Sequence, residues 1–255
     1  MSRYQRHRGA PDYVAGGYEA QALYNGESAV VIGSLVRAGQ AAPAHHLHEH
    51  SDQLYYVTDG QMTIQLGAEQ FDVGPETLVY IPKGTPHHNW NPSAEDEFHF
   101  EVLSPVPWLT DPIATATDST DLGGRRPIIR TLEEVGLKEA LPGFSTARLL
   151  QRSDGSEHMA LYVGQVEPGG AGQGTHVHEF DQFYYVLEGE LTVEVALQRF
   201  TAGPHDLVIL PAGVPHRQWN EGTVAERHLT LLVPEPEPGG VWDAGVDFAP
   251  NGDNH

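Results

Sequence analysis

The sequence predicts an all-β protein made of two tandem β-barrels. The first observation is composition, because 28 Gly and 19 Pro in 255 residues, with 39% apolar residues, favour many short strands joined by turns. The second is an internal repeat that spans most of the chain. The third is local pattern, since both copies of the repeat carry short β-rich runs interrupted by turn residues.

The internal repeat has a nearly constant offset of 129 positions, which relates Gln53 to Gln182. Upstream, His46 and His48 correspond to His176 and His178 with an offset of 130, so the first copy has one extra residue before Gln53. A loop or a β-bulge accommodates such an insertion. The other matching pairs are Gly60 and Gly189, Pro82 and Pro211, Gly84 and Gly213, His87 and His216, Trp90 and Trp219, and Asn91 and Asn220.

Each copy predicts the same succession of strands. It begins with the β-rich runs SAVVIGSLVRAGQ and ARLLQRSDGSEHMALYVGQVEPGG. The runs QLYYVTDGQMTIQL and QFYYVLEGELTVEV each contain two strands broken at a residue pair typical of a hairpin, Asp59-Gly60 or Glu188-Gly189. ETLVYIPKGTPH and HDLVILPAGVPH add an apolar strand closed by a Pro-x-Gly turn, and FHFEVL and RHLTLL add the last strand.

The repeat divides the chain into three parts. We expect an N-terminal barrel over residues 1–110, a linker with a short helix over 111–143, and a C-terminal barrel with an irregular tail over 144–255. The linker is indicated by a stretch rich in Pro, Thr, Asp and Gly, from about Ser104 to Gly124. Thr131 and Glu134 have the spacing of a capping box, which predicts a helix through Leu141.

Charge and composition exclude several classes of partner. The chain has 35 acidic and 14 basic residues, and this excess of negative charge repels nucleic acids and anionic membrane surfaces. No apolar stretch approaches membrane-spanning length, so we expect a cytoplasmic protein with neither a nucleic-acid nor a membrane partner. The chain has no cysteine, so a bound metal must be held by nitrogen and oxygen atoms.

The repeated polar residues predict one metal site in each barrel. Residues two apart in a strand face the same side, so each His-x-His pair directs two imidazoles into one space. Imidazole nitrogens and an amide oxygen suit Fe(II), Mn(II), Ni(II), Zn(II) or Co(II) and leave coordination positions open for a substrate. The candidate ligands are His46, His48, Gln53 and His87 in the first copy, and His176, His178, Gln182 and His216 in the second.

These residues resemble the two motifs of the cupin superfamily, G-x5-H-x-H-x3/4-E-x6-G and G-x5-P-x-G-x2-H-x3-N. The second copy fits them from Gly170 to Asn220, and the first fits from Gly39 to Asn91 with the one-residue shift. The resemblance covers most of the chain and identifies it as a bicupin, a protein of two RmlC-like jelly-roll barrels. It implies up to two divalent transition metals per chain, with Fe(II), Mn(II) or Ni(II) as the first candidates.

The chain departs from the motifs at matching places. The motif glutamate is replaced by Gln53 and Gln182, and the glycine that opens the second motif is replaced by Glu76 and His205. Glutamine is a neutral ligand and cannot take up a proton as a carboxylate does. We therefore expect each metal to carry one more net positive charge than with glutamate and to be a stronger Lewis acid.

Two further pairs are candidates for roles beside the metal. His99 and His228 lie 129 positions apart on the last strand of each copy, and either could act as a catalytic base in place of the missing carboxylate. Packing in the barrel wall is the alternative for these histidines. Tyr55 and Tyr184 share the inward parity of the glutamines, so they are candidate substrate-binding residues, with a core position as the alternative.

The resemblance implies a function for the whole chain. Bicupins similar to this one include quercetin 2,3-dioxygenase, and we expect a metal-dependent dioxygenase that acts with O2 on a small hydroxylated aromatic, flavonol-like or enolic substrate. The flavonol enzymes use the motif glutamate as a base, so the glutamines count against that substrate. Gentisate and diketone dioxygenases, with three neutral histidines, show that O2 chemistry does not require the glutamate.

Two other functions remain open from the sequence. One is a lyase or isomerase that uses the metal only as a Lewis acid, because some cupin hydroxynitrile lyases resemble the His-x-His, Gln and His pattern. The other is a bicupin that binds a small molecule without catalysis. Oxygen consumption separates the first of these from a dioxygenase. Cupins pair their barrels edge to edge, so the chain is compatible with a monomer or a homodimer.

Overall fold

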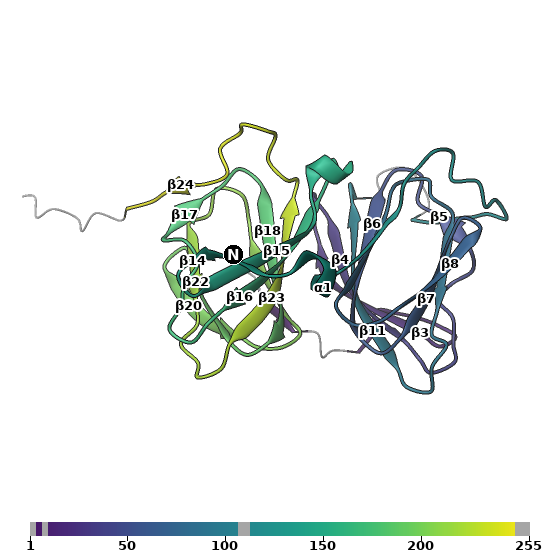
Figure 1. The fold of residues 1–255 in the computed structure, drawn as a ribbon, viewed down its shortest axis with the longest axis horizontal. Helices are drawn as coiled ribbons and strands as arrows, with labels where there is room; N and C mark the ends of the chain where they lie inside the picture. The colour runs from purple at the N-terminus through teal and green to yellow at the C-terminus, as the bar shows by residue number, and fades with distance from the viewer. Residues whose placement is uncertain (1–3, 7–9, 107–112, 248–255) are drawn as a thin grey trace, which may run out of the picture.

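A computed structural model of the protein describes residues 4–6, 10–106 and 113–247. The chain forms two β-barrels that lie side by side, each made of a seven-stranded and a five-stranded sheet (Figure 1). The all-β class and the two-barrel architecture predicted from the repeat are therefore confirmed. None of the helices in the described part of the chain has the length and apolar character needed to span a membrane.

The first barrel contains two antiparallel sheets that pack face to face. Its seven-stranded sheet has the order β13-β9-β6-β11-β4-β3-β2, and its five-stranded sheet has the order β12-β5-β10-β7-β8. The strands are β2 (Tyr13–Ala15), β3 (Tyr18–Asn25), β4 (Val30–Val36), β5 (His46–Leu47), β6 (Asp52–Asp59), β7 (Met62–Leu66), β8 (Glu69–Val73), β9 (Thr77–Ile81), β10 (His87–Trp90), β11 (Glu97–Ser104), β12 (Thr115–Ala116) and β13 (Ile128–Thr131).

The second barrel repeats this plan strand by strand. Its sheets have the orders β1-β21-β18-β23-β16-β15-β14 and β20-β19-β22-β17-β24. The strands are β1 (Tyr4–Arg6), β14 (Lys138–Leu141), β15 (Phe144–Leu150), β16 (Ala160–Val166), β17 (His176–Val177), β18 (Asp181–Glu188), β19 (Leu191–Val195), β20 (Gln198–Ala202), β21 (Asp206–Leu210), β22 (His216–Trp219), β23 (Glu226–Val233) and β24 (Ala244–Gly245).

The two barrels exchange one edge strand each. β1 precedes the first barrel in sequence but pairs with β21 of the second, whereas β13 precedes most of the second barrel but pairs with β9 of the first. An unpaired edge leaves backbone N–H and C=O groups without partners, and the exchange covers both edges. The N-terminal segment 4–6 thus belongs to the second barrel, although we expected residues 1–110 to form the first.

The segment 111–143 is not the simple linker that we expected. Its described part contributes β12 and β13 to the first barrel and β14 to the second. The capping box of Thr131 and Glu134 is present, but helix α1 ends at Val135 rather than continuing to Leu141. Gly136 has a φ of 69°, and the chain beyond it pairs with β15 as a strand, so tertiary pairing overrides the helix.

The C-terminal stretch is also more regular than the irregular tail that we expected. β24 pairs with β17 directly beside the second His-x-His pair, and β12 pairs with β5 beside the first. Val246 N donates to Thr175 O just as Thr117 N donates to His45 O. Each barrel therefore receives a short strand from the chain that follows it, next to its candidate metal ligands.

One hydrophobic core joins the two barrels. The largest buried cluster takes residues from both halves, because the seven-stranded sheets face each other (Figure 1). Across this interface the ring of Tyr24 lies 4.8 Å from that of Phe183, and Phe100 lies 4.9 Å from Tyr185. Each barrel also has a smaller cluster of its own between its two sheets. The strands that carry the glutamines, β6 and β18, thus belong to the sheets that form this shared core, whereas the histidine strands belong to the five-stranded sheets.

The two residues that replace the glycine at the start of the second motif, Glu76 and His205, keep the backbone conformation of a glycine. Glu76 has a φ of 64° and His205 a φ of 67°, a left-handed conformation that favours glycine. Both side chains have partners there: Glu76 forms an ion pair at 2.6 Å with Arg227 of the other barrel, and His205 lies 3.1 Å from the Tyr185 hydroxyl. The left-handed residue in the first barrel therefore supports the contact between barrels.

Candidate metal centres

The structure brings three of the predicted ligands of the first barrel together. His46 lies on β5, His87 lies opposite it on β10, and His48 follows β5 directly. The ring centroids of His46 and His87 are 4.3 Å apart, and those of His46 and His48 are 5.1 Å apart. One nitrogen of each ring lies within 4.8 Å of the others, so the three rings converge on one point.

The second barrel holds the same cluster. His176 on β17 is the backbone partner of His216 on β22, with ring centroids 4.4 Å apart, and His178 completes the group at 4.7 Å from His216. Their nitrogens also lie within 4.8 Å of one another. The one-residue insertion of the first copy falls in the loop between β5 and β6, so it leaves the cluster unchanged.

Backbone carbonyls set the tautomer of all six histidines. A carbonyl oxygen only accepts hydrogen bonds, so a ring nitrogen beside it carries the proton and the other nitrogen presents a lone pair. Every Nδ1 atom has such a partner, which leaves Nε2 as the metal-binding atom. The pairs are His46 with Ala44 at 2.8 Å, His48 with Ile113 at 2.5 Å, His87 with Thr85 at 2.8 Å, His176 with Gly174 at 2.8 Å, His178 with Phe180 at 2.6 Å, and His216 with Val214 at 2.9 Å.

The histidine Nε2 atoms and the Gln53 amide oxygen are suited to bind a divalent cation. Among the described residues, no standard hydrogen-bond partner exists for the buried Nε2 atoms of His48, His87 and His216, or for Oε1 of Gln53. Buried polar atoms without partners are costly, and a cation would satisfy several of them at once. Burial of the rings also disfavours their protonated forms, lowering the pKa of His46 to about 4 and that of His216 to about 3. His46 and His216 therefore stay neutral near pH 7, as metal ligands must.

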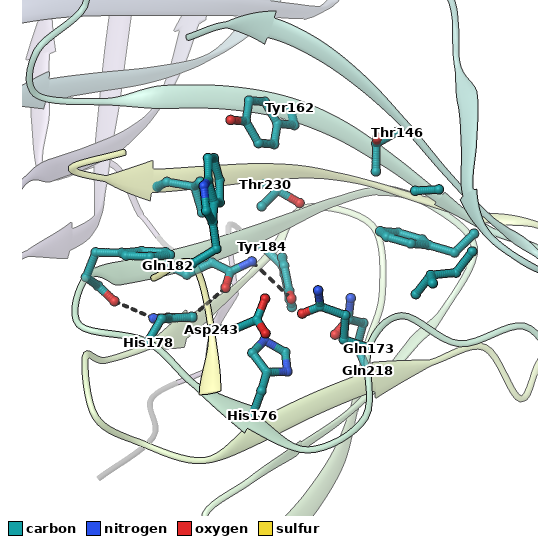
Figure 2. A pocket seen from close by; sticks show the side chains of 16 residues that line it. Thr146, Tyr162, Gln173, His176, His178, Gln182, Tyr184, Gln218, Thr230 and Asp243 are labelled. Atoms are coloured by element: carbon teal, nitrogen blue, oxygen red, sulfur yellow. Dashed lines mark hydrogen bonds between the residues drawn. The ribbon is translucent and has the colours of Figure 1, made fainter. Parts of the chain in front are cut away.

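The glutamine of the second barrel points its oxygen at a histidine lone pair. Gln182 Oε1 lies 2.7 Å from His178 Nε2, and Gln182 Nε2 donates to the Tyr184 hydroxyl at 3.1 Å (Figure 2). Since the proton of the His178 ring is on Nδ1, two acceptors face each other at 2.7 Å. Both atoms are ones that would hold a metal ion, which would relieve this contact, and so would rotation of the amide.

The glutamine of the first barrel has a different partner. Gln53 Nε2 donates to Glu101 Oε1 at 2.6 Å, and Glu101 Oε2 accepts from Ser34 Oγ at 3.0 Å and Tyr18 OH at 3.2 Å. Burial raises the pKa of the Glu101 carboxyl, but His99 and these donors outweigh it and lower the pKa below its usual range. Glu101 is thus a buried carboxylate directly behind a candidate ligand.

This carboxylate changes one expectation from the sequence. We expected both sites to lack the negative charge of the motif glutamate, but in the first barrel Glu101 returns a carboxylate beside Gln53. The signal was present in the alignment of the two copies, where Glu101 corresponds to Thr230, but a mismatch in a repeat does not by itself indicate a function. The hydrogen bond depends on the pairing of β6 with β11, two strands far apart in the chain, which the sequence alone does not show.

His99 and His228 are both buried and both bound to a glutamate. His99 Nδ1 lies 2.9 Å from Glu97, and His228 Nδ1 lies 2.9 Å from Glu226. Burial opposes a charge on His99, but Glu97 and the nearby Glu101 outweigh it and raise its pKa to about 9. Each packs against the tyrosine of its own copy, at ring distances of 4.8 Å for Tyr55 and 4.7 Å for Tyr184, but only His99 is among the described residues that line a cavity.

A cavity opens onto each cluster, and the two differ in size. That of the first barrel has a volume of about 580 Å³ and that of the second about 260 Å³. The predicted substrate-binding residues Tyr55 and Tyr184 each line one of them. Apolar side chains dominate the first cavity, where Ile32, Leu103 and Ile113 face the histidines. This size and lining suit a small, largely apolar organic molecule.

Comparison with known proteins establishes the family. Residues 34–104 and 162–231 each match the family model described as the cupin domain. These matches span more than half of the chain, which therefore belongs to the cupin family and is a bicupin. No curated protein sequence matches the chain.

Several solved structures share this fold at low sequence identity. A variant of oxalate decarboxylase from Bacillus subtilis superposes with a TM-score of 0.72 at 17% identity, covering 95% of this chain and 79% of that one. A protein from Pseudomonas aeruginosa described as glyoxylate-induced has a TM-score of 0.68 at 16% identity, covering 84% of this chain and 80% of that one. At such identities the likeness shows a common fold.

Proposed function

We propose that this bicupin is a metal-dependent dioxygenase for a small hydroxylated aromatic, flavonol-like or enolic substrate, with its reaction site in the first barrel. The metal would be Fe(II), Mn(II) or Ni(II), held by His46, His48, His87 and the Gln53 oxygen. His176, His178, Gln182 and His216 would hold a second ion. The observation that carries the proposal is the set of imidazole Nε2 lone pairs directed at one point beside an apolar cavity of about 580 Å³.

The bound metal would polarise a substrate hydroxyl and bring O2 next to it. The protein would do the rest by binding and orientation. Apolar walls of the cavity suit the ring of an aromatic substrate and exclude water from it. Tyr55 is buried in the cavity wall with its ring 4.8 Å from His99, so both present fixed surfaces to the substrate.

We assign His99 a role different from the base that its position suggested. A ring with a pKa of about 9 is protonated near neutral pH and cannot take up another proton. Its positive charge lies in the cavity wall and would stabilise a phenolate or enolate oxygen of the substrate. His228 is absent from the described lining of the second cavity, which supports a packing role for it.

Charge argues against a small dianionic substrate such as the oxalate named for the structural neighbours. No lysine or arginine occurs among the described residues that line either cavity. In the first cavity the Glu101 carboxylate lies beside the charged His99, so the side chains offer no net positive charge to a dianion. A neutral aromatic or enolic molecule requires no such charge.

A Lewis-acid lyase or isomerase is the second candidate, and the charged His99 favours it. A protonated imidazole beside a metal can donate a proton to a leaving group, which is what a lyase requires and a dioxygenase does not. The third candidate function is binding of a small molecule without catalysis. The three functions differ in oxygen consumption and product formation.

The test begins with metal content. Protein prepared without chelator should hold about two divalent metals per chain, falling to about one in His46→Ala and in His176→Ala. An O2 electrode then screens catechols, flavonols and diketones, with uptake lost in His46→Ala and kept in His176→Ala. Metal without O2 uptake but with product formation would favour the lyase, and metal without either would favour simple binding. Absence of metal would overturn the proposal.

A further inference from the structure

Glu101 determines which way the amide of Gln53 points. Glu101 lies on β11 with only 6% of its surface exposed, and it accepts hydrogen bonds from Gln53, Ser34 and Tyr18. Oε1 of Glu101 accepts from Gln53, and Oε2 accepts from Ser34 and Tyr18, so both carboxylate oxygens are occupied as acceptors. The NH2 group of Gln53 must therefore face Glu101, which leaves the amide oxygen on the other side, next to His48.

The second barrel has no equivalent control. At the position of Glu101 stands Thr230, which pairs with Tyr184 on β18 as Glu101 pairs with Tyr55 on β6. The NH2 group of Gln182 donates to the Tyr184 hydroxyl, which can accept or donate. The Gln182 amide can therefore rotate by half a turn, keep a hydrogen bond to Tyr184, and donate to the lone pair of His178 Nε2 in the metal-free protein.

Two other positions complete this difference between the barrels. Strand pairing places Tyr18 and Phe144 at equivalent sites, opposite Val36 and Val166. The partner residue on the next strand is Ser34 in the first barrel and Gly164 in the second, opposite His99 and His228. The hydroxyls that hold the Glu101 carboxylate are therefore both missing from the second barrel. All three positions differ between the barrels, so the complete set of hydrogen-bonding groups behind the glutamine is found in the first barrel alone among the described residues.

On the basis of the proposed metal sites, we propose that Glu101 is a positioning residue that holds the Gln53 oxygen toward the first metal, so that the first barrel binds divalent metal more tightly than the second. Partners that orient a ligand from behind typically change metal affinity by about 10- to 100-fold. Glu101 also places a negative charge near the cation, which acts in the same direction.

This arrangement explains the glutamine at position 53. A glutamate there would place a second carboxylate at the 2.6 Å distance from Glu101, and two carboxylates so close cannot both ionise. Glutamine avoids this repulsion while it keeps an oxygen for the metal and an N–H for Glu101. The negative charge that the motif glutamate would place on the metal ligand itself lies here on Glu101, the residue that hydrogen-bonds to that ligand.

The test measures each site by itself. His176→Ala leaves only the first site and His46→Ala only the second, and each is titrated with Mn(II) by calorimetry and with Co(II) by visible absorption. We expect Mn(II) to bind the first site at least tenfold more tightly. In the His176→Ala background, Glu101→Gln should weaken Mn(II) binding by about 10- to 100-fold and change the Co(II) spectrum, because a neutral amide no longer dictates the orientation of Gln53.

The matched control is Thr230→Ala in the His46→Ala background, which should change Mn(II) affinity by less than about threefold. Equal affinities of the two sites, or an unchanged affinity and Co(II) spectrum in a folded Glu101→Gln variant, would overturn the inference while leaving the metal sites intact. If Glu101→Gln does not fold, the comparison of the two backgrounds decides. Failure of both backgrounds to bind metal would instead overturn the proposed function.

Discussion

The two barrels have the same strand order and the same histidine cluster, yet they differ behind the glutamine. In the first barrel Gln53 is backed by a buried carboxylate with two hydroxyl partners, and the cavity is large. In the second, Gln182 is backed by a tyrosine hydroxyl, and the cavity is less than half that size. Duplication thus preserved the atoms that would touch a metal while the surrounding residues diverged.

This difference teaches where functional divergence in a repeated fold can occur. The histidines are constrained from both sides, by a carbonyl at Nδ1 and by the cluster at Nε2. The residues one step behind them face only other side chains, so they can be exchanged as a set. Five predictions test how the barrels are joined and how they differ, beginning with the one that has the largest expected effect.

The largest effect concerns the core that joins the barrels. Phe183 is 1% exposed and packs against Tyr24 of the first barrel, so Phe183→Ala should lower the free energy of unfolding by about 3–5 kcal/mol. Both barrels should still unfold in one transition, because they share this core. Chemical denaturation followed by fluorescence and circular dichroism checks this. Two separate transitions in the parent protein would mean that the barrels are independent units.

The second prediction concerns pH in the metal-free protein. Burial lowers the pKa of His46 from 6.5 to about 4, so between these values the unfolded chain binds more protons than the folded one. The free energy of unfolding should therefore decrease by about 3 kcal/mol from this residue as pH falls from 6.5 to 4. Urea titrations at several pH values on chelated protein test it, and His46→Ala should make the acid limb shallower while the contribution of His216 remains.

The third prediction concerns His99 of the first barrel, whose titration should change the free energy of unfolding in the opposite direction in the same urea experiment. Its pKa is raised to about 9, so its charged form stabilises the fold fully below pH 6.5, and this contribution is lost as pH rises toward 9. His99→Gln should remove that alkaline decrease and leave the acid limb unchanged. An alkaline decrease that persists in His99→Gln would contradict the assignment of a charged imidazole.

The fourth prediction sharpens the contrast between the glutamines. Gln182→Glu restores the motif carboxylate where no other carboxylate is its hydrogen-bond partner, so it should tighten Mn(II) binding to the second site by about tenfold. Gln53→Glu should give no such gain, because the new carboxylate would lie against Glu101. Calorimetric titration in the two single-site backgrounds compares them. An equal gain at both sites would remove the distinction.

The smallest effect is expected at the tyrosine that supports Glu101. Tyr18→Phe removes one hydrogen bond to a buried carboxylate that keeps its bonds from Ser34 and Gln53, so it should cost about 1 kcal/mol of stability. The reciprocal change Phe144→Tyr in the second barrel should alter stability by less than about 0.5 kcal/mol, since Phe144 borders the cavity. A Tyr18→Phe cost no larger than that of Phe144→Tyr would argue against a structured carboxylate site.

The sequence by itself determined the class of fold, the number of barrels and the residues of the two histidine clusters. Strand periodicity and turn residues are local patterns, and the repeat is found by comparing the two halves of the chain, so none of them requires the tertiary structure. The sequence did not determine the limits of the barrels, because β1 and β13 are placed by pairing with strands of the other half of the chain. Local pattern cannot tell to which edge a short strand will be added.

Only the tertiary structure decided how the two sites differ. Tyr18, Ser34 and Glu101 come from three strands, β3, β4 and β11, and nothing in their spacing predicts that they meet behind Gln53. The protonation of His99 likewise depends on the buried glutamates around it. The local motif determines which residue types can bind a metal. Their orientation and electrostatic surroundings arise from packing between segments far apart in the chain.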